Sequence, residues 1–393
     1  MHRPRRALVL VALALLVRLA DARALPSKLT DADFWRIVSE FSEPGGYFPS
    51  HNFVSNEMEY QTVIPRLGHT VKPGGVYLGV GPDQNFTYIA SLRPAMVFIV
   101  DIREQNLLQH LLYKALMEMS PTRAEFLSRL FGREKPGEVD DGMTAAALLN
   151  LYGRAEPSAE LHAETSRRVF DVLERQHTFD LTADERDTIT FLLDTFFAWG
   201  PEITYAPVDF DRPFFATSGM RVSMFPSFGE LMTRTDKAGR NHSYLASEAH
   251  YAVVRDLQRR NLIIPIVGDF AGEHALASIG RYVESQGAVV TAIYTSNVEQ
   301  YLFQNDLWRR YYDNVAALPT DGTSTFIRSF FPHGGRIRMN PLVTTYVPGV
   351  SMTAPSLYLY PESVSLLSPV GELVTAVTDG RISGYLDVID MSK

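Results

Sequence analysis

The sequence predicts an α/β protein whose core is a doubly wound, mainly parallel sheet with a helical insertion. Apolar β-rich runs alternate with helical stretches: strands at 76–80, 96–100, 262–267 and 288–294, helices at 86–92, 105–119, 243–258 and 273–285. This alternation favours parallel strands joined by right-handed crossovers. With 46% hydrophobic and 21% charged residues, the chain has an ordinary globular composition and enough apolar residues for a large core.

The remaining stretches predict helices around this core and an insertion within it. Residues 31–41 predict a first helix with Thr30 as its cap. Four further helices are expected at 121–131, 142–151, 158–175 and 182–197. They form an insertion between the second and third core strands, and both a lid and a purely structural cap fit the pattern. Residues 214–222 and the short extended runs after 325 predict edge strands or an appended sheet.

The N-terminus predicts a secretory signal peptide. Three arginines precede the apolar run 7–17, and the small residues at 22–24 have the spacing of a cleavage site before Leu25. An apolar run of this length is shorter than the roughly 20 residues that span a bilayer, so we expect no stable membrane span after cleavage. An uncleaved anchor is the alternative. The expected segments are therefore 1–24, the signal peptide; 25–102, the first half of the core; 103–204, the insertion; and 205–393, the second half. The expected location is periplasmic or secreted.

Composition excludes several classes of site and partner. The chain has no cysteine, which excludes cysteine nucleophiles, iron–sulfur clusters and thiolate zinc sites. Its formal net charge of −8 argues against a nucleic-acid partner. His242 and His250 have no evident third ligand beside them, so we predict no metal site. Nothing in the sequence indicates a particular protein partner.

The stretch 75–103, GVYLGVGPDQNFTYIASLRPAMVFIVDIR, carries the main functional signal. Gly79 and Gly81 allow a tight turn and close approach of the backbone to a ligand. Asp101 ends the second strand 20 residues after Gly81, where an acid can hold a nucleotide ribose. Gln84 takes the place of the third glycine of the dinucleotide fingerprint, which disfavours a pyrophosphate. The pattern therefore predicts a nucleoside ligand without phosphates, although a structural turn would also explain it.

These residues resemble a known class. GVYLGVGPDQN followed by VFIVDIR is similar to the first half of a class I S-adenosylmethionine-dependent methyltransferase core, which has a Rossmann-like fold. The resemblance implies S-adenosylmethionine as cofactor, a turn with Gly79, Gly81 and Asp83 at its methionine part, and Asp101 as the ribose acid. It is strong over 75–103 and only topological elsewhere, and Leu78 stands where many methyltransferases carry an acid. The sequence also resembles a group of bacterial proteins without an assigned activity.

Further contacts to the cofactor are expected around this stretch. Asn85 belongs to the turn, and Ile102 directly follows Asp101 at the end of the second strand. Glu57 lies before the first strand, where a segment can fold over a ligand. For Glu57 the plainer interpretation is a surface loop.

Candidate catalytic residues follow the later strands, because ligands of doubly wound sheets bind beyond the carboxyl ends of the strands. Asp269 follows the strand 262–267, at a place that we take as the end of the fourth core strand, and we expect it to orient or deprotonate an acceptor. Tyr294 and Asn297, at the end of the next strand, are expected to shape the acceptor pocket. A helix N-terminal acid is the alternative for Asp269, and a turn residue is the alternative for Asn297.

Two main functions fit these expectations, and an exported enzyme that uses another small ligand in the same cleft is a third. The first is methyl transfer from S-adenosylmethionine to an unidentified acceptor. Export conflicts with it, because S-adenosylmethionine is a cytoplasmic metabolite. The second is an exported, non-catalytic binding or interaction protein that keeps a methyltransferase-like fold.

Overall fold

The structure is a computed structural model that describes residues 24–206, 221–223, 225–332, 336–340, 346–347, 350–351, 356–360 and 363–393. For the strands between 221 and 223 and between 336 and 360 only the backbone is described. The expected signal peptide lies outside the described residues except for its last residue. Most of the expected strand 214–222 also lies outside them, and its end forms β3 (Arg221–Ser223).

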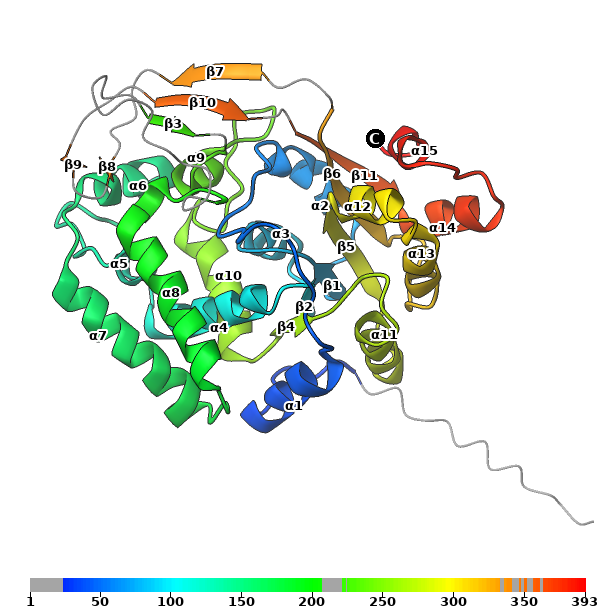
Figure 1. The fold of residues 1–393 in the computed structure, drawn as a ribbon, viewed down its shortest axis with the longest axis horizontal. Coiled ribbons are helices and arrows are strands. Elements are labelled where there is room, and N and C mark those ends of the chain that lie inside the picture. The colour runs from blue at the N-terminus through cyan, green and yellow to red at the C-terminus, as the bar shows by residue number, and fades with distance from the viewer. Residues whose placement is uncertain are drawn as a thin grey trace, which may run out of the picture.

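The fold is α/β, with a six-stranded, mostly parallel sheet flanked by helices and compatible with a Rossmann-like fold (Figure 1). The strand order is β11-β6-β5-β1-β2-β4, and only β11 runs antiparallel to its neighbour. The bounds of these strands are β1 Val76–Gly79, β2 Met96–Asp101, β4 Ile263–Val267, β5 Val290–Ser296, β6 Thr325–Phe330 and β11 Val364–Pro369. Every residue of β1, β2 and β4 is buried, as expected of parallel strands covered on both faces.

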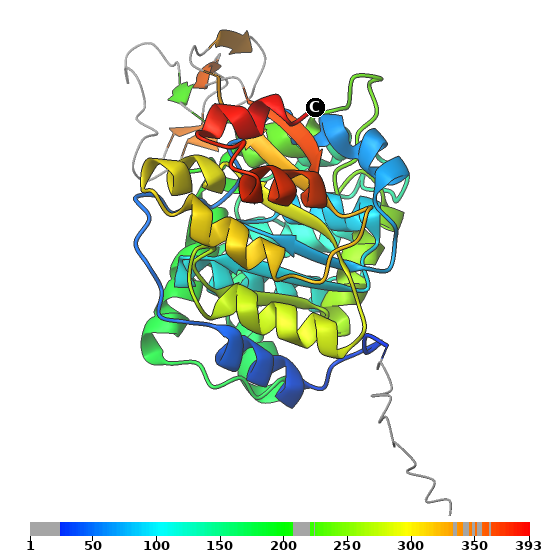
Figure 2. The same cartoon turned by 90° about the vertical axis from the view of Figure 1, so that its right-hand side faces the viewer.

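One group of helices packs together beside β2 and β4. It contains α3 (Gln84–Leu92), α4 (Glu104–Met119) and α10 (Glu248–Arg259), with α2 (Ile64–Thr70) and the 3-10 turn η1 (Tyr60–Val63) next to α3. A second group is formed by α1 (Asp31–Phe41), α11 (Ala275–Ser285), α13 (Trp308–Ala316) and α14 (Val370–Thr378), which contact one another in that order (Figure 2). The smaller helices α12 (Val298–Gln304) and α15 (Tyr385–Asp390) contact each other near β5.

The expected insertion 103–204 is helical throughout its described elements. Its first helix, α4, packs on β2 and β4, whereas the following helices pack mainly on one another and on α4. These are α5 (Arg123–Phe131), α6 (Ala145–Arg154), α7 (Ala159–Phe170), the π-helix η2 (Asp171–Gln176), α8 (Ala183–Trp199) and η3 (Gly200–Glu202). Capping boxes start two of them, with Thr122 and Glu125 at α5 and Thr182 and Glu185 at α8. The short helix α9 (Phe228–Thr233) follows and contacts α6 and η3.

The chain after 325 contains both an edge strand and an appended sheet, as the sequence predicted. Strand β11 lies at the edge of the main sheet, next to β6. A separate three-stranded sheet has the order β3-β10-β7, with β10 (Ser356–Tyr360) antiparallel to β7 (Arg336–Asn340). A two-stranded sheet is formed by β8 (Tyr346–Val347) and β9 (Val350–Ser351). Within the described ranges, no helix has both the length and the hydropathy to cross a bilayer.

Local sequence explains α1, whose bounds match the predicted helix. Thr30 accepts a hydrogen bond from the backbone N–H of Asp33 at 3.0 Å, as an N-cap residue does. Phe34, Ile37 and Val38 form the buried face of the helix at i, i+3 and i+4 spacing.

A partly buried ionic network ties α1, α4 and the insertion to the sheet. His177, at the end of η2, contacts Asp31 through Nδ1 and Glu118 through Nε2, both at 2.7 Å. Lys114, which is 1% exposed, donates to Glu118 at 2.6 Å and to Asn261, directly before β4. Burial lowers the pKa of His177, but the hydrogen bond and charge of Glu118 outweigh this effect, so that the pKa is raised above its usual value. Two carboxylates accept from this ring, so the network requires the imidazolium form.

We predict that this network makes stability depend on pH. Because the pKa of folded His177 is raised, its contribution is complete below the usual histidine value of about 6.5 and is lost as the pH rises through the folded value. Replacing His177 by glutamine should lower the free energy of unfolding by about 2 kcal/mol at pH 6, and by less at pH 9. Urea denaturation at both pH values measures the difference, with the exposed His69→Gln as control. An equal loss at both pH values would contradict the imidazolium.

Candidate functional site

A cavity of about 420 Å³ opens at the carboxyl ends of β1, β2, β4 and β5. This volume falls in the range of small-molecule sites, and the position is the one at which doubly wound sheets bind ligands. The lining residues come from the loop before η1, from the ends of the four strands and from α12: Tyr47, Phe48, Pro49, Asn52, Val54, Ser55, Asn56, Glu57, Val80, Gly81, Pro82, Gln84, Asp101, Ile102, Arg103, Tyr205, Gly268, Asp269, Phe270, Ser296, Asn297, Val298, Tyr301, Leu302, Asn305 and Leu307.

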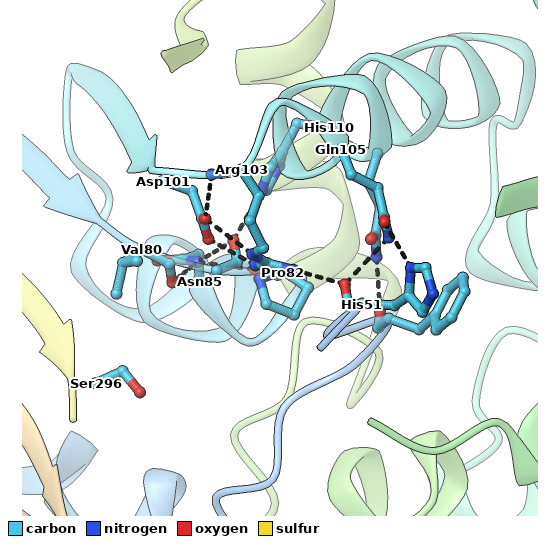
Figure 3. A network of polar contacts seen from close by, with 12 residues as sticks. His51, Val80, Pro82, Asn85, Asp101, Arg103, Gln105, His110 and Ser296 are labelled. Atoms are coloured by element: carbon cyan, nitrogen blue, oxygen red, sulfur yellow. Dashed lines mark hydrogen bonds and ion pairs between the residues drawn. The ribbon is translucent and has the colours of Figure 1, made fainter. Parts of the chain in front are cut away.

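The turn between β1 and α3 forms one wall, and the side-chain amide of Asn85 holds its shape. The Nδ2 atom of Asn85 lies 2.9, 3.1 and 2.8 Å from the carbonyl oxygens of Val80, Gly81 and Pro82 (Figure 3). Its Oδ1 accepts from the hydroxyl of Tyr77 at 2.9 Å. All its polar atoms are therefore used inside the protein, and Asn85 supports the turn instead of contacting a ligand in the cavity.

The two glycines of the turn serve different purposes. Gly81 has a φ of +78°, a conformation that side chains rarely adopt, and it lines the cavity. Gly79 does not line the cavity, and a Cβ there would overlap Oδ1 of Asn85. Gly79 therefore makes room for the Asn85 amide. On the far side of the turn, Nε2 of His110 lies 2.9 Å from the carbonyl of Gly81, and burial lowers the pKa of this histidine to about 4. The neutral ring donates from Nε2.

Asp101 and Ile102 both line the cavity, and Asp101 is paired with Arg103 (Figure 3). Oδ1 of Asp101 accepts from the backbone N–H and from Nε of Arg103, at 2.9 and 3.0 Å, and Oδ2 accepts from Nη2 at 2.7 Å. Arg103 also donates from Nη1 to the carbonyl of His51 at 2.6 Å. Since a carboxylate accepts about four hydrogen bonds, Asp101 keeps room for one further donor.

A loop from residue 42 to residue 56 crosses the ends of β2 and β4 and covers the site. The backbone N–H of Glu43 donates to Val267 at 3.0 Å, and that of Gly46 donates to Ile102 at 2.8 Å. The guanidinium of Arg103 lies over the ring of Phe48, with its Cζ atom 5.9 Å from the ring centre. Phe48 also packs edge-on against Tyr301 of α12. The described lining residues include none from 104–204, so the insertion does not itself form a wall of this cavity.

Two of the predicted site residues lie behind the wall. Asp83 is 1% exposed, accepts from the hydroxyl of Tyr244 at 3.2 Å and does not line the cavity. Burial raises its pKa to about 7. Tyr294 is fully buried, and its hydroxyl accepts from Nε2 of Gln84 at 3.0 Å. Gln84 itself lines the cavity, and Tyr294 also hydrogen-bonds the lining residue Glu57, so Tyr294 acts on the site through these two residues.

Of the three candidate catalytic residues, Asp269 and Asn297 line the cavity and Tyr294 lies behind its wall. Asp269 follows β4 and Asn297 follows β5, and β2 and β1 lie between these strands. Three strand spacings, about 14 Å, separate the two strands, so Asp269 and Asn297 reach the same cavity from different strand ends. The strand before Asp269 is the third parallel strand along the chain, whereas the strand before Asn297 is the fourth. Asp269 also has a local role, because its Oδ1 accepts from the backbone N–H of Ala271 at 2.9 Å.

Glu57 lines the cavity near Asn297, although it is only 1% exposed. Its two carboxylate oxygens accept from the hydroxyls of Ser296 and Ser329. Burial raises its pKa, against the effect of these hydrogen bonds. The plainer interpretation as a surface loop residue is therefore wrong for Glu57.

Sequence reasoning missed four residues of this site. Arg103, Gln84, Ser296 and Phe48 all line the cavity. Arg103 and Ser296 each lie within two residues of a predicted position at a strand end, so the rule that led to Asp101 and Asn297 was sufficient to include them. No pattern in the sequence indicated Phe48. In the described part of the chain, no three histidine, aspartate or glutamate side chains are grouped to hold a metal ion.

We predict that the turn depends on the amide of Asn85. Replacing it by aspartate removes the Nδ2 donor and places a carboxylate beside three carbonyl oxygens, which should cost about 3 kcal/mol of stability. Urea denaturation measures this loss. Asn305→Asp is the control, because Asn305 makes a single exposed hydrogen bond, to Tyr301. Similar losses in the two variants would contradict the role given to Asn85.

Comparison with known proteins places the chain in a family. No curated protein matches it significantly. The family described as "Domain of unknown function (DUF7790)" matches residues 52–194 and 222–347. The first stretch contains the turn, Asp101 and the start of α8, and the second contains β4, β5 and β6. Since the match covers more than half of the chain, the protein belongs to the DUF7790 family.

Proposed function

We propose that the protein binds S-adenosylmethionine in this cavity and transfers its methyl group to an acceptor. The observation that carries the proposal is that Gly81 and Asp101 line the same cavity at the ends of adjacent parallel strands. The fold supports it further. Numbered along the chain, the five parallel strands have the order 3-2-1-4-5 across the sheet, and this order supports a doubly wound sheet with its switch point between β1 and β5. The cavity lies at this switch point.

The lining residues fit a nucleoside better than a phosphate ester. Gln84 occupies the position where a third glycine would leave space for a pyrophosphate, and it lines the cavity. Arg103 is the one cation among the described lining residues, and it is already paired with Asp101. A phosphate group would therefore find no unpaired positive side chain there.

Several polar atoms at the cavity still lack partners. Oε1 of Gln84 and Oδ1 of Asn52 are buried acceptors without a hydrogen-bond partner in the described protein, and both residues line the cavity. Asp101 has room for one more donor. Buried polar atoms are rarely left unpaired in a complete site, so these atoms favour a ligand with several hydroxyl or amino groups.

Methyl transfer requires little chemistry from the protein itself. S-adenosylmethionine supplies a methyl group on a sulfonium that already makes it reactive, so the protein has to hold an acceptor in line with that methyl group and exclude water. The aromatic side chains Phe48, Tyr205 and Tyr301 around the cavity provide an apolar environment for this step. Asn297 and Ser296, at the switch point, are the polar groups that we assign to the acceptor side.

The alternative is a binding protein without catalysis. The pairing of Asp101 with Arg103 favours it, because the carboxylate has one acceptor position left and cannot receive both hydroxyls of a ribose. In this alternative the cavity holds a ligand in a similar pose and no methyl group is transferred.

Calorimetry with S-adenosylmethionine and S-adenosylhomocysteine tests the proposal. We expect both to bind the full chain, and we expect Asp101→Asn to weaken binding by about tenfold, since one charged hydrogen bond is lost. Asp256→Asn, in the exposed pair with Arg260, is the matched control and should bind as the parent does. Absence of binding of either compound to the parent protein would contradict the proposal, and binding without methyl transfer to any offered acceptor would favour the binding protein.

A further inference from the structure

The charge of Glu57 has no counterpart in the described protein. Its carboxylate is almost fully buried, yet no lysine, arginine or histidine of the described residues forms an ion pair with it. Its partners are the hydroxyls of Ser296, Ser329 and Tyr294, which are neutral. A buried carboxylate that lacks an opposite charge is costly, and proteins rarely keep one without a role.

Other acids of similar burial are treated differently in this protein. Glu299 is 1% exposed and pairs with the buried Arg328, whose Nε lies 2.6 Å from Oε2. Asp101 is 4% exposed and pairs with Arg103. Asp83 is the exception, because it is 1% exposed and its partner is the neutral hydroxyl of Tyr244, but it does not line the cavity. Among these four acids, Glu57 is therefore the one that both lines the cavity and lacks an arginine partner.

The two ends of the cavity differ in whether the acid that lies there is paired with a cation. At the ends of β2 and β4, Asp101 is neutralised by Arg103. At the end of β5, Glu57 and the hydroxyl of Ser296 lie near Asn297, whereas Arg103, the one positive side chain among the described lining residues, is paired with Asp101. Figure 3 shows Ser296 apart from the network of Asp101 and Arg103. A ligand that lies along the strand ends therefore meets, at its β5 end, an acid that pairs with no lysine, arginine or histidine of the described residues.

We propose that the cavity takes a ligand with an ammonium or other cationic group, and that Glu57 pairs with this group beside Ser296. The inference rests on the proposed function, because S-adenosylmethionine and S-adenosylhomocysteine carry an amino-acid ammonium that adenosine lacks. The two serine hydroxyls hold the carboxylate in place before the ligand binds. Glu57 comes from the loop before η1. It supplies an acid to the turn that follows β1, because β1 itself ends on the uncharged residues Leu78 and Gly79.

Binding of Glu57→Gln tests this pairing. Glutamine keeps the shape and loses the charge, so S-adenosylhomocysteine should bind about ten- to a hundredfold more weakly, while adenosine should bind the variant and the parent equally. Asp256→Asn, in the exposed pair with Arg260, is the control and should leave both affinities unchanged. Equal affinity of the parent and Glu57→Gln for S-adenosylhomocysteine would overturn the inference and leave the proposed function standing. Failure of the parent protein to bind any of the compounds would overturn the proposed function and this inference with it.

A second measurement separates a ligand contact from a structural role. Because burial raises the pKa of Glu57, the carboxylate destabilises the folded protein increasingly as the pH rises above the ordinary glutamate value. Without ligand, Glu57→Gln should therefore unfold at an equal or higher urea concentration than the parent at pH 8. A clearly lower midpoint would show that Glu57 holds the fold together, and it would overturn the assignment to a ligand.

Discussion

The carboxamide of Asn85 fixes the turn on which the cavity depends. By bridging three successive carbonyl oxygens, it holds Gly81 in a left-handed conformation and leaves one face of the turn open. Gly79 is required because a side chain there would displace the amide, and Tyr77 and His110 fix the amide and the turn from behind. The glycines, the amide and the buried histidine therefore form one unit, which presents Gly81 to the cavity.

Hydrogen bonds and ion pairs between residues far apart in the sequence hold the other walls of the cavity around this turn. The loop 42–56 is fastened to the ends of β2 and β4 by backbone hydrogen bonds and to Arg103 through the carbonyl of His51. On the other side, the buried pair of Glu299 and Arg328 anchors α12, which contributes Tyr301 and Leu302 to the wall. Arg328 also donates to Ser368 of β11 and to Ser392 near the C-terminus, so the end of the chain helps to hold the site.

The core elements could be predicted because their signals are local. Thr30 and the spacing of Phe34, Ile37 and Val38 define α1, and the continuous apolar runs define β1, β2, β4 and β5. Strand order is not local. The position of Asp269 in space depends on β4 pairing with β2 at the edge of the sheet, and no residue near Asp269 encodes that pairing. The orientation of the Asp83 side chain likewise depends on Tyr244, and the burial of Glu57 depends on Ser329. Both partners lie far along the chain.

The central claim is that the ends of β1, β2, β4 and β5 form a ligand site and are not merely an unfilled gap. A crystal structure of the full chain grown with S-adenosylhomocysteine tests it most directly. The account predicts that the compound lies against the backbone of Gly81, with its ribose toward Asp101 and its amino group toward Glu57. A structure in which side chains of the protein fill this space, or in which the compound lies elsewhere, would contradict it.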